Sequence, residues 1–180
     1  ILKNVFETLT EMNYADSSLT PGLALSWKQI DQNTWHFALR KGVKFHDGAD
    51  FNADAVVFNL KRVYEPKIDP ASRSKFLIGI KMEAKAVDPY TVAIRTEKFE
   101  PLLPALMGTM SVCSPNTPPD KVTRAPIGTG PYKFVKWDTG KQIVLERFNG
   151  YWGKRPQVEK AVYVWRTESS VRAAMVEIGE

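Results

Sequence analysis

The sequence predicts an α+β protein that consists mostly of antiparallel or mixed sheets with a few helices. Segments with alternating apolar and polar residues outnumber helical segments, and most are joined by short turns rich in Asp, Asn, Pro and Gly. A chain of 180 residues is long enough to bury a sizeable core. Its hydrophobic fraction of 43%, with 25% charged residues, is typical of a globular protein.

The first part of the chain predicts a short helix followed by a hairpin. Residues 1–9 have the pattern of a short helix or of a strand–helix junction, and the polar stretch Met12–Ser18 is expected to be a loop. Leu23–Ile30 and Thr34–Arg40 are predicted strands joined by a turn at 31–33. Apolar and polar residues alternate in the second strand, which places one of its faces against a core.

The stretch Leu39–Leu60 combines a strand end, a polar turn and the start of a helix. Asp47 and Gly48 form a turn pair, since glycine tolerates a positive φ. Asn52 stands where an N-cap belongs, so a helix is predicted over Ala53–Tyr64. Apolar residues at helical spacing predict its buried face: Val56, Val57, Leu60, Val63 and Tyr64.

The middle of the chain predicts a second hairpin, a short helix and a linker. Ile80–Val87 and Thr91–Thr96 alternate like a half-buried antiparallel pair. Pro101 is expected at the first position of a helix over Leu102–Met107, where the missing N–H of proline has no partner to lose. The Pro- and Asn-rich stretch Pro115–Lys121 is the best linker candidate.

The last third predicts a third hairpin, a further strand and a helix. Tyr132–Trp137 and Gln142–Phe148 flank a polar turn, Val158–Arg166 is the next strand, and Glu168–Ile178 is the helix. The expected roles of its side chains are a core contact for Val162 and Val164, a helix cap from Thr167 or Ser169, and one apolar helix face at Val171, Ala174, Met175 and Ile178.

We find no combination of residues that supports catalysis, metal binding or a cofactor. His36 and His46 lie in different local settings with no third partner, and the single Cys113 is expected to be a buried thiol. Gly128–Gly130 is followed by Pro131 and a strand, whereas a phosphate loop would continue into Gly-Lys-Ser/Thr or a helix. This glycine pair therefore predicts a tight turn that lets two backbones cross.

The charge pattern argues against a nucleic-acid partner. The net charge is +5 and the pI about 9.3, but basic residues are scattered and interleaved with acidic ones, which predicts a solvated basic surface. No apolar run reaches the roughly 18 residues that a membrane span needs. The chain begins at Ile1 inside a segment with a structured pattern, and we expect either a trimmed chain or an internal fragment.

Several sequence blocks resemble one known family, the family 5 extracellular solute-binding proteins. These are the peptide-, nickel- and glutathione-binding subunits of ABC importers. The blocks follow the family's order over nearly the whole chain: LALSW at Leu23–Trp27, TWHFALR at Thr34–Arg40, the stretch Leu39–Leu60, APIGTGPYKF at Ala125–Phe134, NGYWG at Asn149–Gly153 and SVRAAMVEIGE at Ser170–Glu180.

The resemblance implies part of a periplasmic-binding-protein-like fold (type II, cluster C). Residues 7–115 would be a small domain inserted in the first lobe, 1–6 and 116–180 would belong to that ligand-binding lobe, and the second lobe would be absent. The implied function is capture of peptides or peptide-like solutes by closure of two lobes. The implied partners are permease subunits, and the implied state is a periplasmic monomer, or a lipid-anchored one in a Gram-positive host. The alternative is a sensory module of the same fold that presents ligand occupancy to a membrane partner.

Two segments are candidate solute contacts within this resemblance. Arg73 is a candidate for pairing a carboxylate and Phe76 for packing an apolar group, the alternative being a solvated loop with Phe76 in the core. Met110 and Ser111, in the short predicted strand Met110–Ser114, are expected to line the cleft. The resemblance implies an arginine near Ser111 in relatives that bind nickel complexes, and its absence from the neighbouring sequence disfavours that class of solute. The tryptophans are expected in the core: Trp27, Trp35, Trp137 and Trp152.

Overall fold

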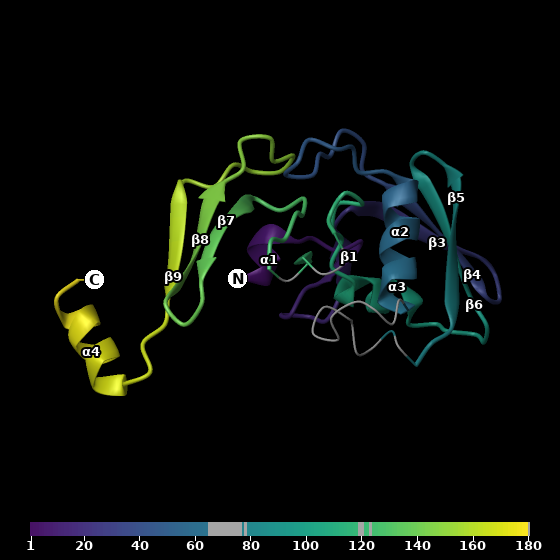
Figure 1. The fold of residues 1–180 in the computed structure, drawn as a ribbon. Helices are drawn as coiled ribbons and strands as arrows, with labels where there is room; N and C mark the ends of the chain where they lie inside the picture. The colour runs from purple at the N-terminus through teal and green to yellow at the C-terminus, as the bar shows by residue number, and fades with distance from the viewer. Residues whose placement is uncertain (65–76, 78, 119–120, 123, 180) are drawn as a thin grey trace.

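The computed structural model describes residues 1–64, 77, 79–118, 121–122 and 124–179. Within these residues, three antiparallel sheets and four α-helices are arranged along an elongated molecule (Figure 1). The strands are β1 (Thr10–Met12), β2 (Leu19–Pro21), β3 (Ala24–Asp31), β4 (Thr34–Leu39), β5 (Met82–Asp88), β6 (Thr91–Thr96), β7 (Tyr132–Asp138), β8 (Gln142–Arg147) and β9 (Lys160–Val164). The helices are α1 (Leu2–Val5), α2 (Ala53–Tyr64), α3 (Leu103–Leu106) with the 3-10 turn η2 (Met107–Thr109), and α4 (Ser169–Glu177).

The largest sheet has the strand order β3-β4-β6-β5 and contains both hairpins predicted in the first two thirds of the chain. Aspartates close both turns: the N–H of Asn33 donates to Asp31 Oδ1 at 2.8 Å, and that of Tyr90 to Asp88 Oδ1 at 2.7 Å. The hairpins join through β4 and β6, where Phe37 lies opposite Val92. The expected α+β architecture of short antiparallel units is confirmed.

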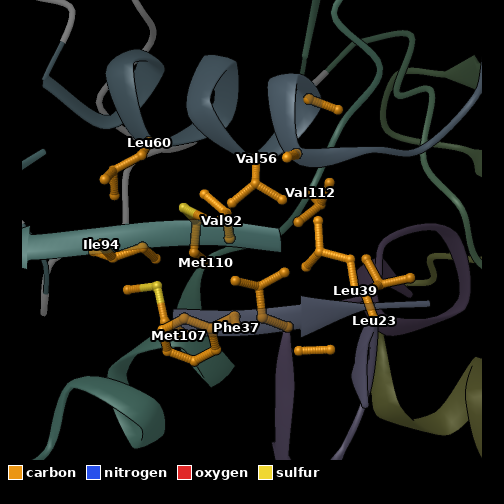
Figure 2. Close-up of a cluster of buried hydrophobic side chains, with 14 of the residues drawn as sticks. Leu23, Phe37, Leu39, Val56, Leu60, Val92, Ile94, Met107, Met110 and Val112 are labelled. Carbon is orange, nitrogen blue, oxygen red and sulfur yellow. The ribbon is translucent and has the colours of Figure 1, made fainter. Parts of the chain in front are cut away.

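Helix α2 covers one face of this sheet (Figures 1 and 2). Its predicted bounds are confirmed, and the N-cap works as expected, since the N–H of Ala55 donates to Asn52 Oδ1 at 3.0 Å. Val56 and Leu60 point onto Val92 and the other inward residues of β4 and β6. Burying each of these side chains stabilises the fold by about 1.5–3 kcal/mol. This larger core collects buried residues from Leu9 to Val112.

The three-stranded sheet β7-β8-β9 lies at the other end of the molecule, with α1 between the two sheets (Figure 1). A smaller core forms on its inner face from Val5, Phe6, Cys113, Val122 and Leu145. The face of β9 was predicted wrongly: Ala161 and Tyr163 pack inward, while Val162 and Val164 are 46% and 45% exposed. The register explains the difference, because Ala161 lies opposite the fully buried Leu145 and side chains alternate between faces.

Two helix predictions also need correction. Helix α4 stands apart from the sheets and none of its residues is buried, so its apolar stripe does not enter a core here (Figure 1). Its N-cap is Glu168, without a side-chain cap, and Arg172 instead donates back to the carbonyl oxygens of Arg166 and Thr167. At α3 the proline in the first turn is Pro104, not Pro101, in a position where the missing N–H is again harmless.

Candidate functional site

The segment Met110–Ser114 runs between α2 and the N-terminal chain, and it holds the two described residues predicted to contact solute. Met110 is 1% exposed and packs in the larger core (Figure 2). Ser111 is half-buried. The predicted strand is reduced to one bridge, in which the N–H of Val112 donates to the Glu7 carbonyl at 3.0 Å. Arg73 and Phe76, the other predicted contacts, lie outside the described residues.

Asn59 of α2 fixes this segment as a neighbouring strand would. Its Nδ2 donates to the carbonyl oxygen of Cys113 at 2.7 Å, and the N–H of Cys113 donates to its Oδ1 at 2.9 Å. The same Nδ2 donates to the Ala55 carbonyl at 2.8 Å. Asn59 is fully buried, so these bonds satisfy a polar group that would otherwise be costly in the core.

Arg62, one helical turn further along α2, holds the other end of the segment. Its Nη2 donates to the carbonyl oxygen of Ser111 at 2.9 Å and to Asn59 Oδ1 at 3.2 Å. An arginine therefore does lie beside Ser111, but α2 supplies it. Neither side chain was predicted from the sequence as part of the site, although polar residues three apart within an apolar helix face are the available signal.

Cys113 is the buried thiol that the sequence predicted, with its Sγ 3.3 Å from Asn59 Oδ1. Burial raises the pKa of this thiol, so it stays protonated at neutral pH. A protonated, buried thiol is a poor nucleophile. Cys113 accordingly has a packing role beside Asn59.

On the other side of the segment, Glu7 turns its carboxylate into a small aromatic cluster. Glu7 Oε1 accepts a hydrogen bond from the Tyr151 hydroxyl at 3.0 Å, and Oε2 accepts one from Trp152 Nε1 at 2.9 Å. The guanidinium of Arg40 stacks 3.9 Å from the centre of the Trp152 ring. Burial raises the pKa of Glu7 even though these donors oppose the rise, and burial with the nearby Glu7 charge raises the pKa of Tyr151.

The backbone of the Gly128–Gly130 turn lies very close to the backbone of Asn4 and Val5. A Cβ added to Gly128 would lie 2.0 Å from the Val5 carbonyl oxygen, and one added to Gly130 would lie 2.6 Å from that of Asn4. No real side chain tolerates such distances. The prediction of a tight turn with closely crossing backbones is confirmed.

The turn at Phe45–Ala49 faces the Gly128–Gly130 turn and the segment after Cys113. Asp47 Oδ2 accepts hydrogen bonds from Ser114 Oγ at 2.7 Å and Asn116 Nδ2 at 3.1 Å. Burial opposes ionisation of Asp47, but these donors and the N–H of Ala49 together lower its pKa. His46, next to it, contacts the glycine turn with both ring nitrogens.

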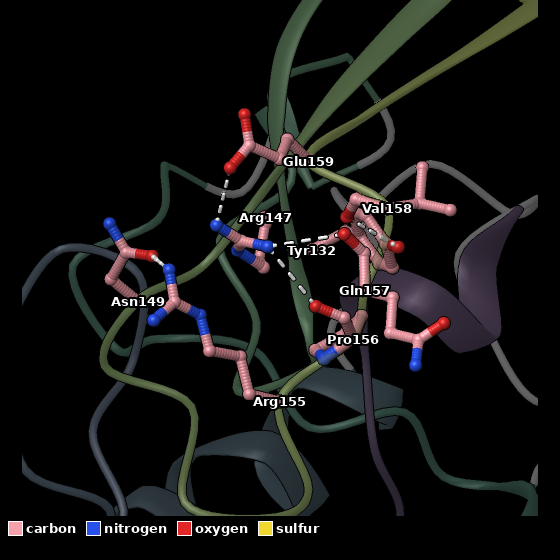
Figure 3. A network of polar contacts seen from close by, with 8 residues as sticks. All are labelled: Tyr132, Arg147, Asn149, Arg155, Pro156, Gln157, Val158 and Glu159. Atoms are coloured by element: carbon pink, nitrogen blue, oxygen red, sulfur yellow. Dashed lines mark hydrogen bonds and ion pairs between the residues drawn. The ribbon is translucent and has the colours of Figure 1, made fainter.

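A second polar network fastens the loop after β8 rather than forming a site (Figure 3). Arg147 pairs with Glu159 at 2.8 Å and donates to the carbonyl oxygens of Pro156 and Gln157. Tyr132 completes the network by donating to the Val158 carbonyl at 3.0 Å. Among the described residues, neither Met110 nor Ser111 lines the hollows of about 390 Å³ beside Arg147 and about 540 Å³ at the β5–β6 edge.

The polar side chains of the candidate site fix the shape of the backbone around Ser111. Across the described part of the chain, no three His, Cys, Asp or Glu side chains gather closely enough to bind a metal. Among the same residues, no helix has both the length and the apolar character to cross a membrane. The buried polar side chains near Ser111 are engaged mainly with backbone groups, which keeps that segment in one shape.

Comparison with known proteins gives relatives along nearly the whole chain. The dipeptide-binding protein of Escherichia coli K12 is 33% identical over 202 aligned residues, which cover 98% of this chain and 38% of that protein. An HTH-type transcriptional regulator, SgrR of Escherichia coli O6:K15:H31, is 30% identical over 92% of this chain and 28% of its own length. Among solved structures, the periplasmic binding protein DppA from Helicobacter pylori, in complex with the peptide STSA, is similar with a TM-score of 0.83 and 30% identity over 98% of this chain and 40% of that one.

The chain thus spans less than half the length of these relatives. Residues 18–180 match the family described as bacterial extracellular solute-binding proteins, family 5 Middle. The periplasmic-binding-protein-like fold and the resemblance drawn from the sequence blocks are both confirmed. This chain belongs to the family 5 bacterial extracellular solute-binding proteins.

Proposed function

We propose that this chain serves in the solute-binding component of an ABC importer, which captures peptides or peptide-like solutes outside the cytoplasmic membrane. The observation that carries the proposal is the family match over residues 18–180, together with 33% identity to a dipeptide-binding protein across 98% of the chain. The protein would act as a monomer in the periplasm, or lipid-anchored in a Gram-positive host. It would deliver its unaltered cargo to permease subunits.

The same proposal divides the chain into parts. Residues 7–115 form the small inserted domain, and 1–6 with 116–180 form part of the first lobe. The two cores support this division, because the larger one spans Leu9 to Val112 while the smaller one combines Val5 and Phe6 with Val122 and Leu145. Cys113, close to the boundary, is the member of the smaller core that the inserted domain contributes. Ser111 is the described residue best placed to contact solute, since it is half-buried beside the boundary and its carbonyl is held by Arg62.

Isothermal titration calorimetry on the full-length gene product tests the function. Dipeptides, tripeptides and glutathione would be titrated separately, and at least one should bind with a dissociation constant in the micromolar range or tighter, about −8 kcal/mol. A glycine-containing tripeptide with both termini blocked is the matched control, since loss of terminal charges should weaken binding. Absence of binding by all these solutes would contradict the proposal.

A sensory module is the second candidate, and one specific observation favours it. The relative SgrR, named as an HTH-type transcriptional regulator, aligns with 92% of this chain at 30% identity. A sensor would bind solute without handing it to a permease. Reconstitution of the full-length protein with its cognate permease in vesicles separates the two, because an importer component stimulates uptake of the solute it binds and a sensor does not.

A further inference from the structure

The imidazole of His46 lies across the ends of the Gly128–Gly130 turn. Its Nε2 is 2.9 Å from the carbonyl oxygen of Gly130, and the N–H of Gly128 donates to its Nδ1 at 3.3 Å. The backbone N–H of His46 also donates to the Gly128 carbonyl at 2.9 Å. One residue therefore makes three contacts with one turn.

These contacts link the two cores. His46 follows Phe45, which is fully buried in the larger core, while the glycine turn bonds to the N-terminal chain through Gly130 N–H and the Val5 carbonyl at 2.9 Å. Val5 belongs to the smaller core. The ring thus sits where the four-stranded body meets the segment that leads into β7.

The hydrogen-bond pattern defines the protonation state that fits. Because Gly128 donates to Nδ1, this nitrogen has to be the acceptor, and the proton of the neutral ring lies on Nε2, where it can be donated to Gly130. Protonation of the ring would place a second N–H on Nδ1, directed at the N–H of Gly128. The two donors would repel, and the Gly128 bond would be lost.

The surroundings favour the neutral ring. Phe148 contacts the imidazole edge-on with the ring centres 4.9 Å apart, and burial lowers the pKa of His46. The charged groups that act on the ring are Asp47 of its own turn, which favours the charged form, and Lys133 of β7, which disfavours it. Lys133 is itself paired with Glu146 at 2.6 Å.

We infer that His46 is a pH-sensitive latch: the neutral ring fastens both ends of the Gly128–Gly130 turn, and protonation breaks the bond at Gly128 while the bond at Gly130 stays. The release is local, because the bonds from His46 N–H to Gly128 and from Gly130 N–H to Val5 do not depend on the ring. Acidification would therefore loosen the connection between the two cores without unfolding either one. This inference goes beyond the proposed function and does not depend on which solute is bound.

Amide hydrogen exchange followed by NMR tests the latch. The protection factor of the Gly128 amide, corrected for intrinsic exchange, should fall about tenfold as the pH is lowered from 8 through the titration of the His46 ring, which corresponds to the loss of one hydrogen bond. The amide of Val92 in the larger core serves as an internal reference and should keep its protection. The chain has only two histidines, so His36→Gln, on strand β4, is the matched control and should retain the loss at Gly128.

The His46→Gln variant keeps one donor and one acceptor but cannot be protonated, so its Gly128 protection should be independent of pH. If this variant does not fold, the wild-type protein alone tests the inference. The pH at which half of the Gly128 protection is lost must then coincide with the titration midpoint of the His46 ring nitrogens. Unchanged protection in the wild type, a loss that persists in folded His46→Gln, a midpoint that departs from the ring titration, or an equal fall at Val92 would overturn the inference.

Discussion

Asn59 and Cys113, 54 residues apart in the sequence, pair as two neighbouring strands would, with one side-chain amide replacing a peptide group. The donor and acceptor of Cys113 are both satisfied by this single side chain. The pairing fixes the segment that carries Ser111 against a helix instead of a sheet. It is the contact on which the shape of the candidate site depends most directly.

Asn59→Leu should therefore lower the free energy of unfolding by about 3 kcal/mol, because the buried N–H and carbonyl of Cys113 lose their partner and the guanidinium of Arg62 keeps only the Ser111 carbonyl. Urea denaturation measures the change. The control is Asn149→Ala, at an exposed asparagine, for which we expect a change within about 0.5 kcal/mol. Equal stability of the two variants would show that the pairing is unimportant.

Gly130→Val should destabilise the protein by at least about 3 kcal/mol or prevent folding, since its Cβ would lie 2.6 Å from the Asn4 carbonyl oxygen. Circular dichroism during heating gives the melting temperature. Gly79→Ala is the comparison, because a Cβ there meets nothing within 4 Å. A wild-type melting curve for Gly130→Val would reject the close backbone approach.

Glu7→Gln should become more stable relative to the wild type as the pH rises. The folded pKa of Glu7 is raised by burial, so its stabilising contribution is complete below the unfolded pKa of about 4.3 and is lost as the pH rises through the folded value. Glutamine stays neutral throughout and can still accept from Trp152. Urea denaturation at pH 4, 6 and 8 measures the free energy of unfolding of both proteins. If the value for Glu7→Gln minus that for the wild type fell as the pH rose, the pKa of Glu7 would not be raised in the folded protein.

The 180 residues alone should bind peptide with a dissociation constant weaker than about 1 mM, or −4.1 kcal/mol. The family fold grips solute between two lobes, and this chain spans 38% of its dipeptide-binding relative. Calorimetry on the isolated chain and on the full-length product, with the same peptide, gives the comparison. Equal affinity of the two would show that the described residues form a complete site.

Ser111→Trp in the full-length product should weaken peptide binding at least tenfold, about 1.4 kcal/mol, by filling space that the solute needs. The melting temperature should change little, since Ser111 is only half-buried. Ser26→Trp, at an exposed position on β3, is the matched control and should leave affinity unchanged. If Ser111→Trp and the control Ser26→Trp both bind peptide as tightly as the wild type, Ser111 is not a solute contact.

Local features were predictable from the sequence because their causes are local. Asn52 and the apolar spacing that follows it fixed α2, and aspartates fixed the two hairpin turns of the large sheet. Features that depend on distant partners were not. Which side chains of β9 face the core depends on its register with Leu145 in β8. The hydrogen bonds that fix Cys113 come from Asn59, which lies 54 residues earlier in the sequence.

Helix α2 has two structural roles, and one substitution in it can affect both. Its apolar side packs in the larger core through Val56 and Leu60. Asn59 and Arg62 hold the backbone of the segment Met110–Ser114 by hydrogen bonds. A substitution that repacks the helix would displace both polar side chains with it. If Ser111 contacts solute as proposed, such a substitution would change the stability of the fold and the affinity for solute together.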